Sequence, residues 1–421
     1  MRNPELRGSP HPHFAMPVLD RLTVLAKRTA LLVLLADVVH CYRFIVDYQT
    51  EADKPISAEE EQQIVKQYEG DCESGAVVTN AEYEQRVNEA LQFMESYGSH
   101  HDHAMFKVFR ESIGFAGGGR AAFMQLAHPF VAAGIRDHSY LQNGVRKRFY
   151  NTFRYVFGMV YGDAWEIRQA SRAVRALHNK VHGELEEHVG VFTPQSRFDA
   201  NQKDAMRYVQ WTLLESSVFE YELLVGALTE QEKNDLAVAS SRFLLLFGVD
   251  DQSNITWKQF KHRLDATNQS KLIQVSETAL DTQEFLFLPP APQYAPLMGL
   301  VKWTTLVALP TKIARQFGGR EYTTLGDRVG FALIHGLVRF LYRFFPGSFR
   351  YLGAYWKMME RETGPRGWVS TSLSKVSAAV AKFLVSAMMP ERDPDQAIQA
   401  VREIRKGKRS PIVGTNTQPI N

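Results

Sequence analysis

The chain has 421 residues and a formal net charge of +3. Apolar residue types make up 45% of it and charged types 23%, which is typical of a folded globular protein and excludes a disordered or collagen-like chain. The small net charge gives no electrostatic argument for nucleic acid, and we expect no such partner. Two cysteines, Cys41 and Cys72, exclude a disulfide scaffold and a four-cysteine metal site, and they suit a reducing, intracellular compartment.

The N-terminal region begins with a proline-rich segment, residues 1–16, which we expect to be unstructured. An apolar run follows over residues 29–46, but Asp37, His40 and Arg43 interrupt it. A charge at the centre of a spanning helix costs about 3 kcal/mol, so we do not predict a membrane span here. A helix lying in the membrane interface and an ordinary buried helix are the two alternatives.

Helical periodicity predicts that most of the remaining chain is α-helical. The polar stretch over residues 47–75 fits a solvated helix or a linker. The predicted helices span residues 80–109, 121–133, 145–182, 203–228, 231–247, 297–317, 326–345 and 366–389. Breaks are predicted at the glycine-rich residues 111–120 and the proline-rich residues 285–296. Because no alternating strands and no repeat are found, the expected fold class is all-α, an irregular helical bundle.

A second apolar stretch, residues 329–345, is rich in aromatic side chains and carries Arg339 and Arg343 one helical turn apart. It is short for a span and charged, so a core helix is the favoured interpretation. Contact with a membrane, or cover over an apolar pocket, is the alternative.

Several common catalytic motifs are missing from the sequence. The glycines of Gly117–Arg120 are not followed by Lys-Ser/Thr, which excludes a phosphate loop, and they lack the spacing of a dinucleotide fingerprint. No Gly-x-Ser-x-Gly and no His-Glu-x-x-His sequence occurs. We therefore expect these glycines to allow a tight turn into the next helix.

The histidines carry the chemical information. His100, His101 and His103 cluster with Asp102, and a solvated polar turn is favoured there over a metal site. His128 lies in an apolar helix, where a buried structural histidine is the ordinary interpretation.

His178 and His182 lie four residues apart in a predicted helix and should project from one face. A metal site would need a third ligand, such as Glu184 or a neighbouring glutamate. A haem would need only one imidazole and a large apolar pocket, which the aromatic residues 149–161 could line. A polar helix face and plain core packing stay open as alternatives.

The order and spacing of several segments resemble the catalytic domain of ER-bound oxygenases and rubber oxygenases (latex-clearing proteins). The similarity covers roughly residues 100–320. The segments are GGGRAAFMQLAHPFVAAGIRDHS (117–139), RFYNT (148–152), YGDA (161–164), VRALHNKVHG (174–183), FGV (247–249) and LPTKIARQFG (309–318). The resemblance implies a globin-like helical core that holds haem b and activates dioxygen, with oxidative C=C cleavage or a related oxidation of an apolar isoprenoid or lipid-like substrate.

The resemblance also implies roles for individual residues. His178 matches the histidine of an Arg-x-x-His-x-x-Val-x-Gly stretch and would be the proximal ligand of the haem iron. Arg148 and Thr152 match an Arg-x-x-x-Thr pattern on the other side of the haem and would be its catalytic and cofactor-binding residues. Asn151 stands where rubber oxygenases have a lysine that closes off the iron, and this shorter, neutral side chain argues against that gating and against latex-type specificity. His138, like His128, matches a family position without an assigned role.

The expected organisation is an N-terminal extension over residues 1–95, a haem-binding catalytic domain over residues 96–345, and a C-terminal helical extension over residues 346–421 with a basic tail. An apolar channel between the helices of 145–161 and 297–345 is expected to admit the substrate. One alternative is a haem-free helical protein that binds lipid or a partner at a membrane surface, and another is a non-haem metal enzyme using His178 and His182. Peripheral membrane association fits both the haem-dependent oxygenase and the haem-free lipid-binding protein.

Overall fold

The computed structural model describes residues 16–73, 78–96, 103–139, 145–251, 256–289 and 292–388, together with residues 401 and 403. Within these residues it has 18 α-helices and one two-stranded sheet. The predicted all-α fold is therefore confirmed, and the globin-like arrangement stays a prediction. The chain ends that we expected to be unstructured lie outside the described residues, except that Met16 begins the first helix.

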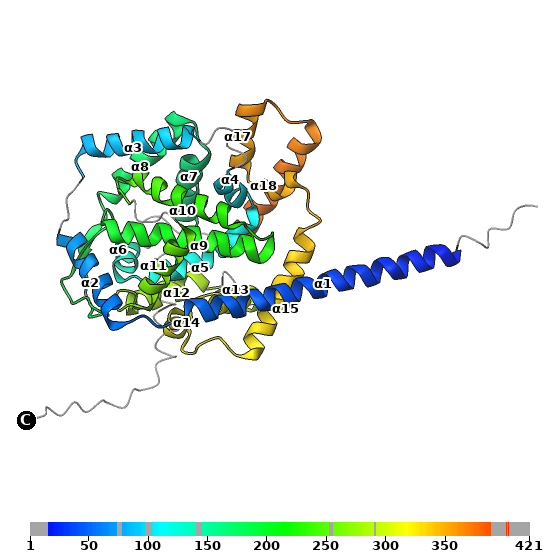
Figure 1. The fold of residues 1–421 in the computed structure, drawn as a ribbon, viewed down its shortest axis with the longest axis horizontal. Helices are drawn as coiled ribbons and strands as arrows, with labels where there is room; N and C mark the ends of the chain where they lie inside the picture. Colours follow the sequence, from blue (N-terminus) through cyan, green and yellow to red (C-terminus); the bar gives the residue numbers. More distant parts are fainter. Residues whose placement is uncertain are drawn as a thin grey trace, which may run out of the picture.

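The helix α9 (Lys203–Leu224) crosses the centre of the body (Figure 1), and helices from the N-terminal, middle and C-terminal parts of the chain pack against it. Most of its residues are buried, as expected for a helix that has neighbours on all sides. The other helices of the body are α2 (Ala58–Glu73), α3 (Asn80–Glu95), α4 (Ala104–Phe109), α5 (Gly118–Leu126), α6 (Pro129–Ser139), α7 (Val145–Tyr161), α8 (Ala164–His178), α10 (Glu230–Leu244), α11 (Trp257–Gln269), α12 (Glu277–Phe287), α13 (Ala295–Val307), α14 (Thr311–Gly318), α16 (Gly347–Arg350), α17 (Gly353–Thr363) and α18 (Trp368–Met388). The short 3-10 helices are η3 (Ser112–Gly117), η4 (Leu245–Phe247) and η5 (Pro292–Tyr294).

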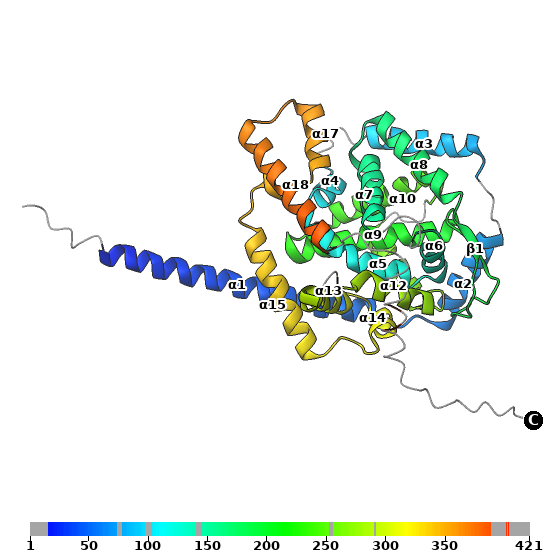
Figure 2. The same cartoon turned by 180° about the vertical axis from the view of Figure 1, so that it is seen from behind.

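The first helix, α1 (Met16–Ala52), is 37 residues long, and its N-terminal half extends away from the body (Figures 1 and 2). Its C-terminal half packs along α15 (Leu325–Tyr342). The two backbones meet at Gly336, where an added Cβ would lie 2.6 Å from Cγ2 and 2.7 Å from Cα of Val38. Glycine is therefore required at this crossing.

The charge that interrupts the apolar run of α1 is paired inside the protein. Asp37 accepts hydrogen bonds from Arg339 at 3.0 Å and from Arg343 at 2.7 Å, so the two arginines predicted to share a face of α15 both bind it. In the part of the chain that the structure describes, one helical segment, Ala26–Ala52, is long and apolar enough to cross a membrane by length and composition alone. Only 17% of its most apolar window is buried in the protein.

The helix predicted over residues 145–182 is interrupted twice. Gly162 ends α7, and α8 ends at His178. The chain then turns, with the Val181 N–H donating to the His178 carbonyl at 2.9 Å, into strand β1 (His182–Glu184), which pairs antiparallel with β2 (Arg197–Asp199). The prediction that His178 and His182 project from one helical face is therefore wrong, because His182 lies on a strand and is exposed.

The glycines before Arg120 serve close packing rather than a tight turn. Gly117 and Gly118 have φ of −72° and −60°, which any residue adopts. An added Cβ on Gly117 would lie 2.6 Å from Cγ of Glu220, and one on Gly119 would lie 3.0 Å from Oγ1 of Thr305. These two glycines let the start of α5 approach α9 and α13, which corrects the expectation of a turn.

Arg120 is one of the largest fully buried side chains. Its guanidinium donates to the carboxylate of Glu215, to Oγ of Ser216 at 2.6 Å, to the hydroxyl of Tyr48 and to the carbonyl of Ala308 at 2.8 Å. These bonds satisfy a buried charge that would otherwise be costly, and they join α1, α5, α9 and the end of α13.

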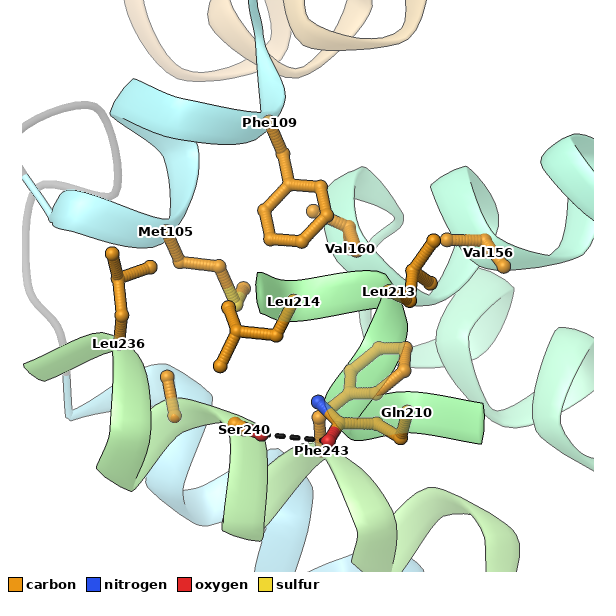
Figure 3. Close-up of a pocket in the computed structure, with 11 residues that line it drawn as sticks. Met105, Phe109, Val156, Val160, Gln210, Leu213, Leu214, Leu236, Ser240 and Phe243 are labelled. Carbon is orange, nitrogen blue, oxygen red and sulfur yellow. Dashed lines mark hydrogen bonds between the residues drawn. The ribbon is translucent and has the colours of Figure 1, made fainter. Parts of the chain in front are cut away.

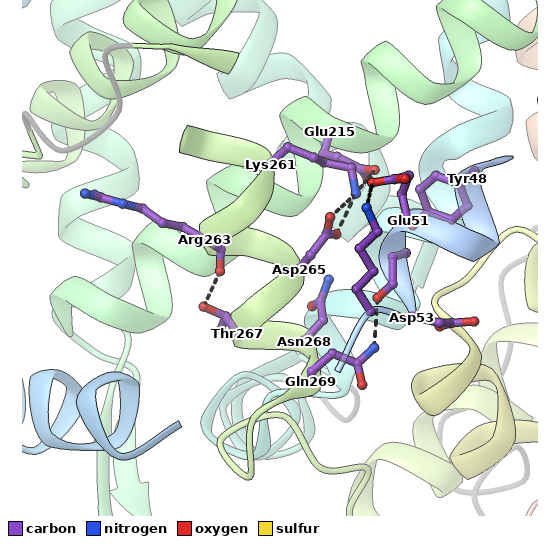
Figure 4. A network of polar contacts seen from close by, with 12 residues as sticks. Tyr48, Glu51, Asp53, Glu215, Lys261, Arg263, Asp265, Thr267, Asn268 and Gln269 are labelled. Atoms are coloured by element: carbon purple, nitrogen blue, oxygen red, sulfur yellow. Dashed lines mark hydrogen bonds and ion pairs between the residues drawn. The ribbon is translucent and has the colours of Figure 1, made fainter. Parts of the chain in front are cut away.

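Figure 4 shows the continuation of this network toward α11. The Lys261 ammonium donates to both carboxylate oxygens of Asp265, at 2.5 and 2.7 Å, and lies 3.8 Å from Glu215. Burial raises the pKa of Asp265 to about 6 despite the neighbouring ammonium. The network thus links α11 to α1, α5 and α9.

Candidate functional site

The predicted site residues lie on the hairpin formed by α7 and α8. Asp163 follows Gly162 directly and caps α8 in a capping box with Glu166, so that the helix begins at Ala164. The two helices pack closely, because an added Cβ on Gly158 would lie 3.3 Å from Cβ of Ala170. With so short a connection the helices run antiparallel, so the start of α7 and the end of α8 lie at the same end of the hairpin.

That end carries positions 148, 152 and 178. His178 is half-buried, and its ring stacks on Phe247, with 6.3 Å between centroids and 26° between planes. Thr152 is exposed, and the side chain of Arg148 lies outside the description. The structure thus brings the helical positions of all three predicted residues to one end of the hairpin, while their roles stay predictions.

The residues around His178 hold it in place. Arg175 donates to the carbonyl of Val78 at 2.6 Å and lies over the ring of Tyr83 at 4.2 Å. On the other side, Gly183 pairs with Phe198, whose ring leaves no room for a Cβ. In the pattern Arg-x-x-His-x-x-Val-x-Gly, the arginine and the glycine therefore fix the backbone on either side of His178.

A column of aromatic rings leads from His178 into the body. Phe247 lies 5.6 Å from Phe243, centroid to centroid. The 3-10 helix η4, which carries Phe247, is fastened to α8 because Ser171 donates to the carbonyl of Leu246. The FGV segment was part of the resemblance, but no sequence pattern predicts that the ring of Phe247 lies against His178.

A small apolar cavity, here called the inner cavity, lies where Phe243 ends the column. Val156 and Val160 of α7, Phe109 and Leu213 also line it, and its volume is about 30 Å³ (Figure 3). The two polar side chains in its wall bond to each other, because the Ser240 hydroxyl donates to the side-chain oxygen of Gln210 at 2.7 Å (dashed in Figure 3). Positions 148, 152, 156 and 160 are spaced by four, so Thr152 belongs to the same row of α7 as the two valines.

A second cavity, the outer cavity, shares Phe109, Val156 and Leu213 with the first and has a volume of about 50 Å³. It lies between α7, α9 and the segment that runs from α4 to α5, with Phe115 and Gly118 in its wall. Both cavities border α7, and the predicted substrate channel stays a prediction. Residues 297–345 contribute no lining to either of these two cavities, so the expected second wall stays a prediction.

His128 and His103 occupy structural positions. His128 is buried among the rings of Tyr68, Phe130, Phe192 and Tyr208, and burial lowers its pKa to about 4. The ring of His103 caps α4 by accepting from the backbone of Met105 at 3.2 Å, and its former cluster partners lie outside the described residues, as does the side chain of His138.

Haem and metal make different demands on this site. Among the residues that the structure describes, no three His, Cys, Asp or Glu side chains gather in a way that could hold a metal ion. The donor chemistry does fit haem, which needs one imidazole at a helix end against apolar and aromatic side chains. Both cavities are much smaller than the pockets of several hundred Å³ that hold large ligands. The argument that haem fits this site therefore rests on the His178 imidazole and its aromatic surroundings, and not on a cavity large enough for the ring.

Comparison with known proteins adds one finding. A family model described as ER-bound oxygenase mpaB/B'/Rubber oxygenase, catalytic domain, matches residues 106–340, which is more than half of the chain. The matched part runs from α4 to α15 and includes the α7–α8 hairpin and the lining of both cavities except Met105 and Leu352. No curated protein and no solved structure shows a significant match.

Proposed function

The chain belongs to the family of ER-bound and rubber oxygenases, and from that premise we propose that it is a haem b-dependent oxygenase that uses dioxygen on an apolar, isoprenoid or lipid-like substrate. Family membership makes the protein an oxidoreductase of the oxygenase type. The observation that carries the haem proposal is the half-buried His178 imidazole, stacked on Phe247 at the hairpin end that also holds positions 148 and 152. The expected reaction is C=C cleavage or a related oxidation.

Each residue of the site has a definite task in this proposal. When bound, haem b supplies the redox chemistry that activates dioxygen. His178 would hold the cofactor, and its ring is kept in orientation by Phe247 and by the anchored segments on both sides. Thr152 brings a hydroxyl that donates one hydrogen bond, and Arg148 brings a fixed positive charge. The apolar row that continues into Val156 and Val160 excludes water.

Substitution of the two neighbouring histidines tests the choice of ligand. We expect His178→Ala to lose the Soret band of the haem-loaded protein and His182→Ala to keep most of it, because His182 is exposed on β1. Thr152→Val should keep the band and lower turnover. Equal loss in both histidine variants would refute the ligand, and a preparation that stays colourless during hemin titration would refute the cofactor.

We also propose that α1 and α15 together form a membrane-contacting face. The residues Val329, Leu333, Leu337 and Leu341 follow each other at every fourth position of α15 and are all exposed, with Leu333 55% accessible. The middle of α1 also exposes apolar side chains, with Leu31 56%, Leu32 66% and Leu35 51% accessible. Because α1 is long and apolar enough to cross a membrane and lies against α15, a lipid bilayer is the partner that covers both rows.

Flotation with vesicles of phosphatidylcholine and phosphatidylserine tests this face. The wild-type protein should float with the vesicles, and Leu333→Glu/Leu337→Glu should float less. The control Val191→Glu places a charge on another exposed apolar residue, in the loop between β1 and β2, and should behave like the wild type. Equal flotation of all three would contradict the α15 contact. A protein that floats but never binds haem would favour the lipid-binding alternative.

A further inference from the structure

The outer cavity has features of a binding site that the haem proposal does not use. It adjoins the inner cavity through Phe109, Val156 and Leu213, which line both. Together the two cavities follow the inner face of α7 toward its N-terminal half, where Thr152 lies. A ligand in the outer cavity would therefore point along the same helix that carries the predicted site.

The lining of the outer cavity is chemically apolar although three polar residues border it. Glu111 accepts from Tyr342 at 2.8 Å and from Arg350 at 2.6 and 3.1 Å, so its charge is already paired. Ser216 accepts from Arg120, and Ser217 donates to the carbonyl of Leu213 at 2.8 Å. Because each polar side chain already has a protein partner, the cavity recognises its occupant mainly by apolar contact.

Aromatic rings line the side of the outer cavity that opens to solvent. Phe115 is 38% exposed, and its ring lies 4.7 Å from Phe153 and 5.9 Å from Phe157, centroid to centroid. The cavity volume of about 50 Å³ has room for roughly three or four water molecules. That space is comparable to a few methylene groups, so it accommodates the end of a chain and not a whole lipid.

We propose that the outer cavity binds the apolar end of a long-chain substrate, which enters beside Phe115 and lies against α7. This inference rests on the proposed function, because that function supplies the substrate class. It adds the place where the chain end binds and the residues that limit its size. The rings of Phe153 and Phe157 contact the chain, and the glycines on the opposite side leave the space that it occupies.

Gly118 offers a way to fill this space without disturbing the fold. Its backbone is helical, with φ of −60° and ψ of −37°, and no atom lies within 4 Å of an added Cβ. Gly117 and Gly119 lack this freedom because they contact α9 and α13. Gly118→Leu should therefore block the cavity while keeping the packing. Gly299→Leu is the matched control, since Gly299 is also helical, has open space around its Cβ and lines neither cavity.

The experiment uses a sixteen-carbon alcohol with a photoreactive diazirine at its apolar end, added to the full-length protein with and without bound haem. After irradiation, mass spectrometry should locate adducts on peptides that contain Phe115, Phe153 or Phe157. Gly118→Leu should reduce this labelling at least tenfold, and Gly299→Leu should leave it unchanged. Gly114→Leu, at a second glycine in the cavity wall with open space around its Cβ, should act like Gly118→Leu.

Two labelling results would overturn the inference, namely adducts found only on peptides without Phe115, Phe153 or Phe157, or equal labelling in Gly118→Leu and Gly299→Leu. Thermal melting checks that the variants fold. Failure of the haem proposal is distinguishable, because a protein without a Soret band that still labels α7 refutes the cofactor and leaves the cavity site standing. A protein that binds haem and turns over substrate with unchanged rate in Gly118→Leu refutes the cavity site alone.

Discussion

Glu220 gives the sharpest test of the electrostatics inside α9. Its carboxyl is 4% exposed and packs on Gly117, and its Oε2 has no hydrogen-bond partner among the described residues. Burial raises the pKa of Glu220 to about 7, while the nearby Arg120 works in the opposite direction. The side chain is therefore neutral in the folded protein at pH 5 and charged at pH 8.

The sign of the pH effect follows from this raised pKa. An unfolded glutamate ionises near pH 4.5, so between about pH 4.5 and pH 7 the unfolded state loses its proton first and stability falls as pH rises. At about 1.4 kcal/mol per pKa unit, the folded protein is destabilised by about 3 kcal/mol at pH 8 and by less than about 1 kcal/mol at pH 5. Glu220→Gln removes the charge and keeps the shape.

Urea unfolding followed by circular dichroism at both pH values measures this difference. We expect Glu220→Gln to be nearly as stable as the wild type at pH 5 and about 2 to 3 kcal/mol more stable at pH 8. Glu230→Gln, on a carboxylate that is 81% exposed, should show no such change. A wild-type to Glu220→Gln difference that is the same at pH 5 and pH 8 would refute the reasoning.

Three further predictions follow from contacts described above. Gly336→Leu should force α15 away from Val38, cost about 1 to 3 kcal/mol and make α1 sensitive to limited proteolysis; unchanged protection would contradict the close crossing. Arg120→Met should cost about 3 to 5 kcal/mol in urea unfolding by leaving Glu215 buried with a weaker partner, and adding Glu215→Gln should recover part of the loss; no recovery would argue against the ion pair. The Arg320 guanidinium holds the pKa of Asp327 well below its usual range, so the ionised Asp327 stabilises the folded protein at neutral pH and this stabilisation is lost on acidification. Asp327→Asn should therefore make the melting temperature depend less on pH between pH 7 and pH 3. An unchanged pH dependence would count against this.

The sequence was sufficient for the helical class because apolar residues at steps of three and four mark helices that bury one face. It failed for α11 and α12, which are rich in polar residues, although Thr256 and Ser276 stand before them as N-caps. Local periodicity also could not show that the chain leaves the helix after His178. That exit depends on pairing with Phe198, which is a contact across the intervening loop.

The candidate site was predictable only in part. The four-residue spacing of positions 148, 152, 156 and 160 indicates one face of α7, and the resemblance indicates His178. The ring of Phe247 against His178 and the cavities shared with α4, α9 and α10 depend on tertiary packing. No pattern along a single helix records which distant helix will lie opposite.

The seam between α1 and α15 has a practical consequence for anyone who shortens this protein. Cys41 and Ile45 of α1 are fully buried against Phe219 of α9 and Phe331 of α15, and the family match begins well after α1. Removing α1, so that only the matched residues remain, would expose the apolar side chains of α9 and α15 that α1 covers. The shortened protein should aggregate, whereas the full-length protein should stay monodisperse in a detergent that covers the exposed leucines of α1 and α15.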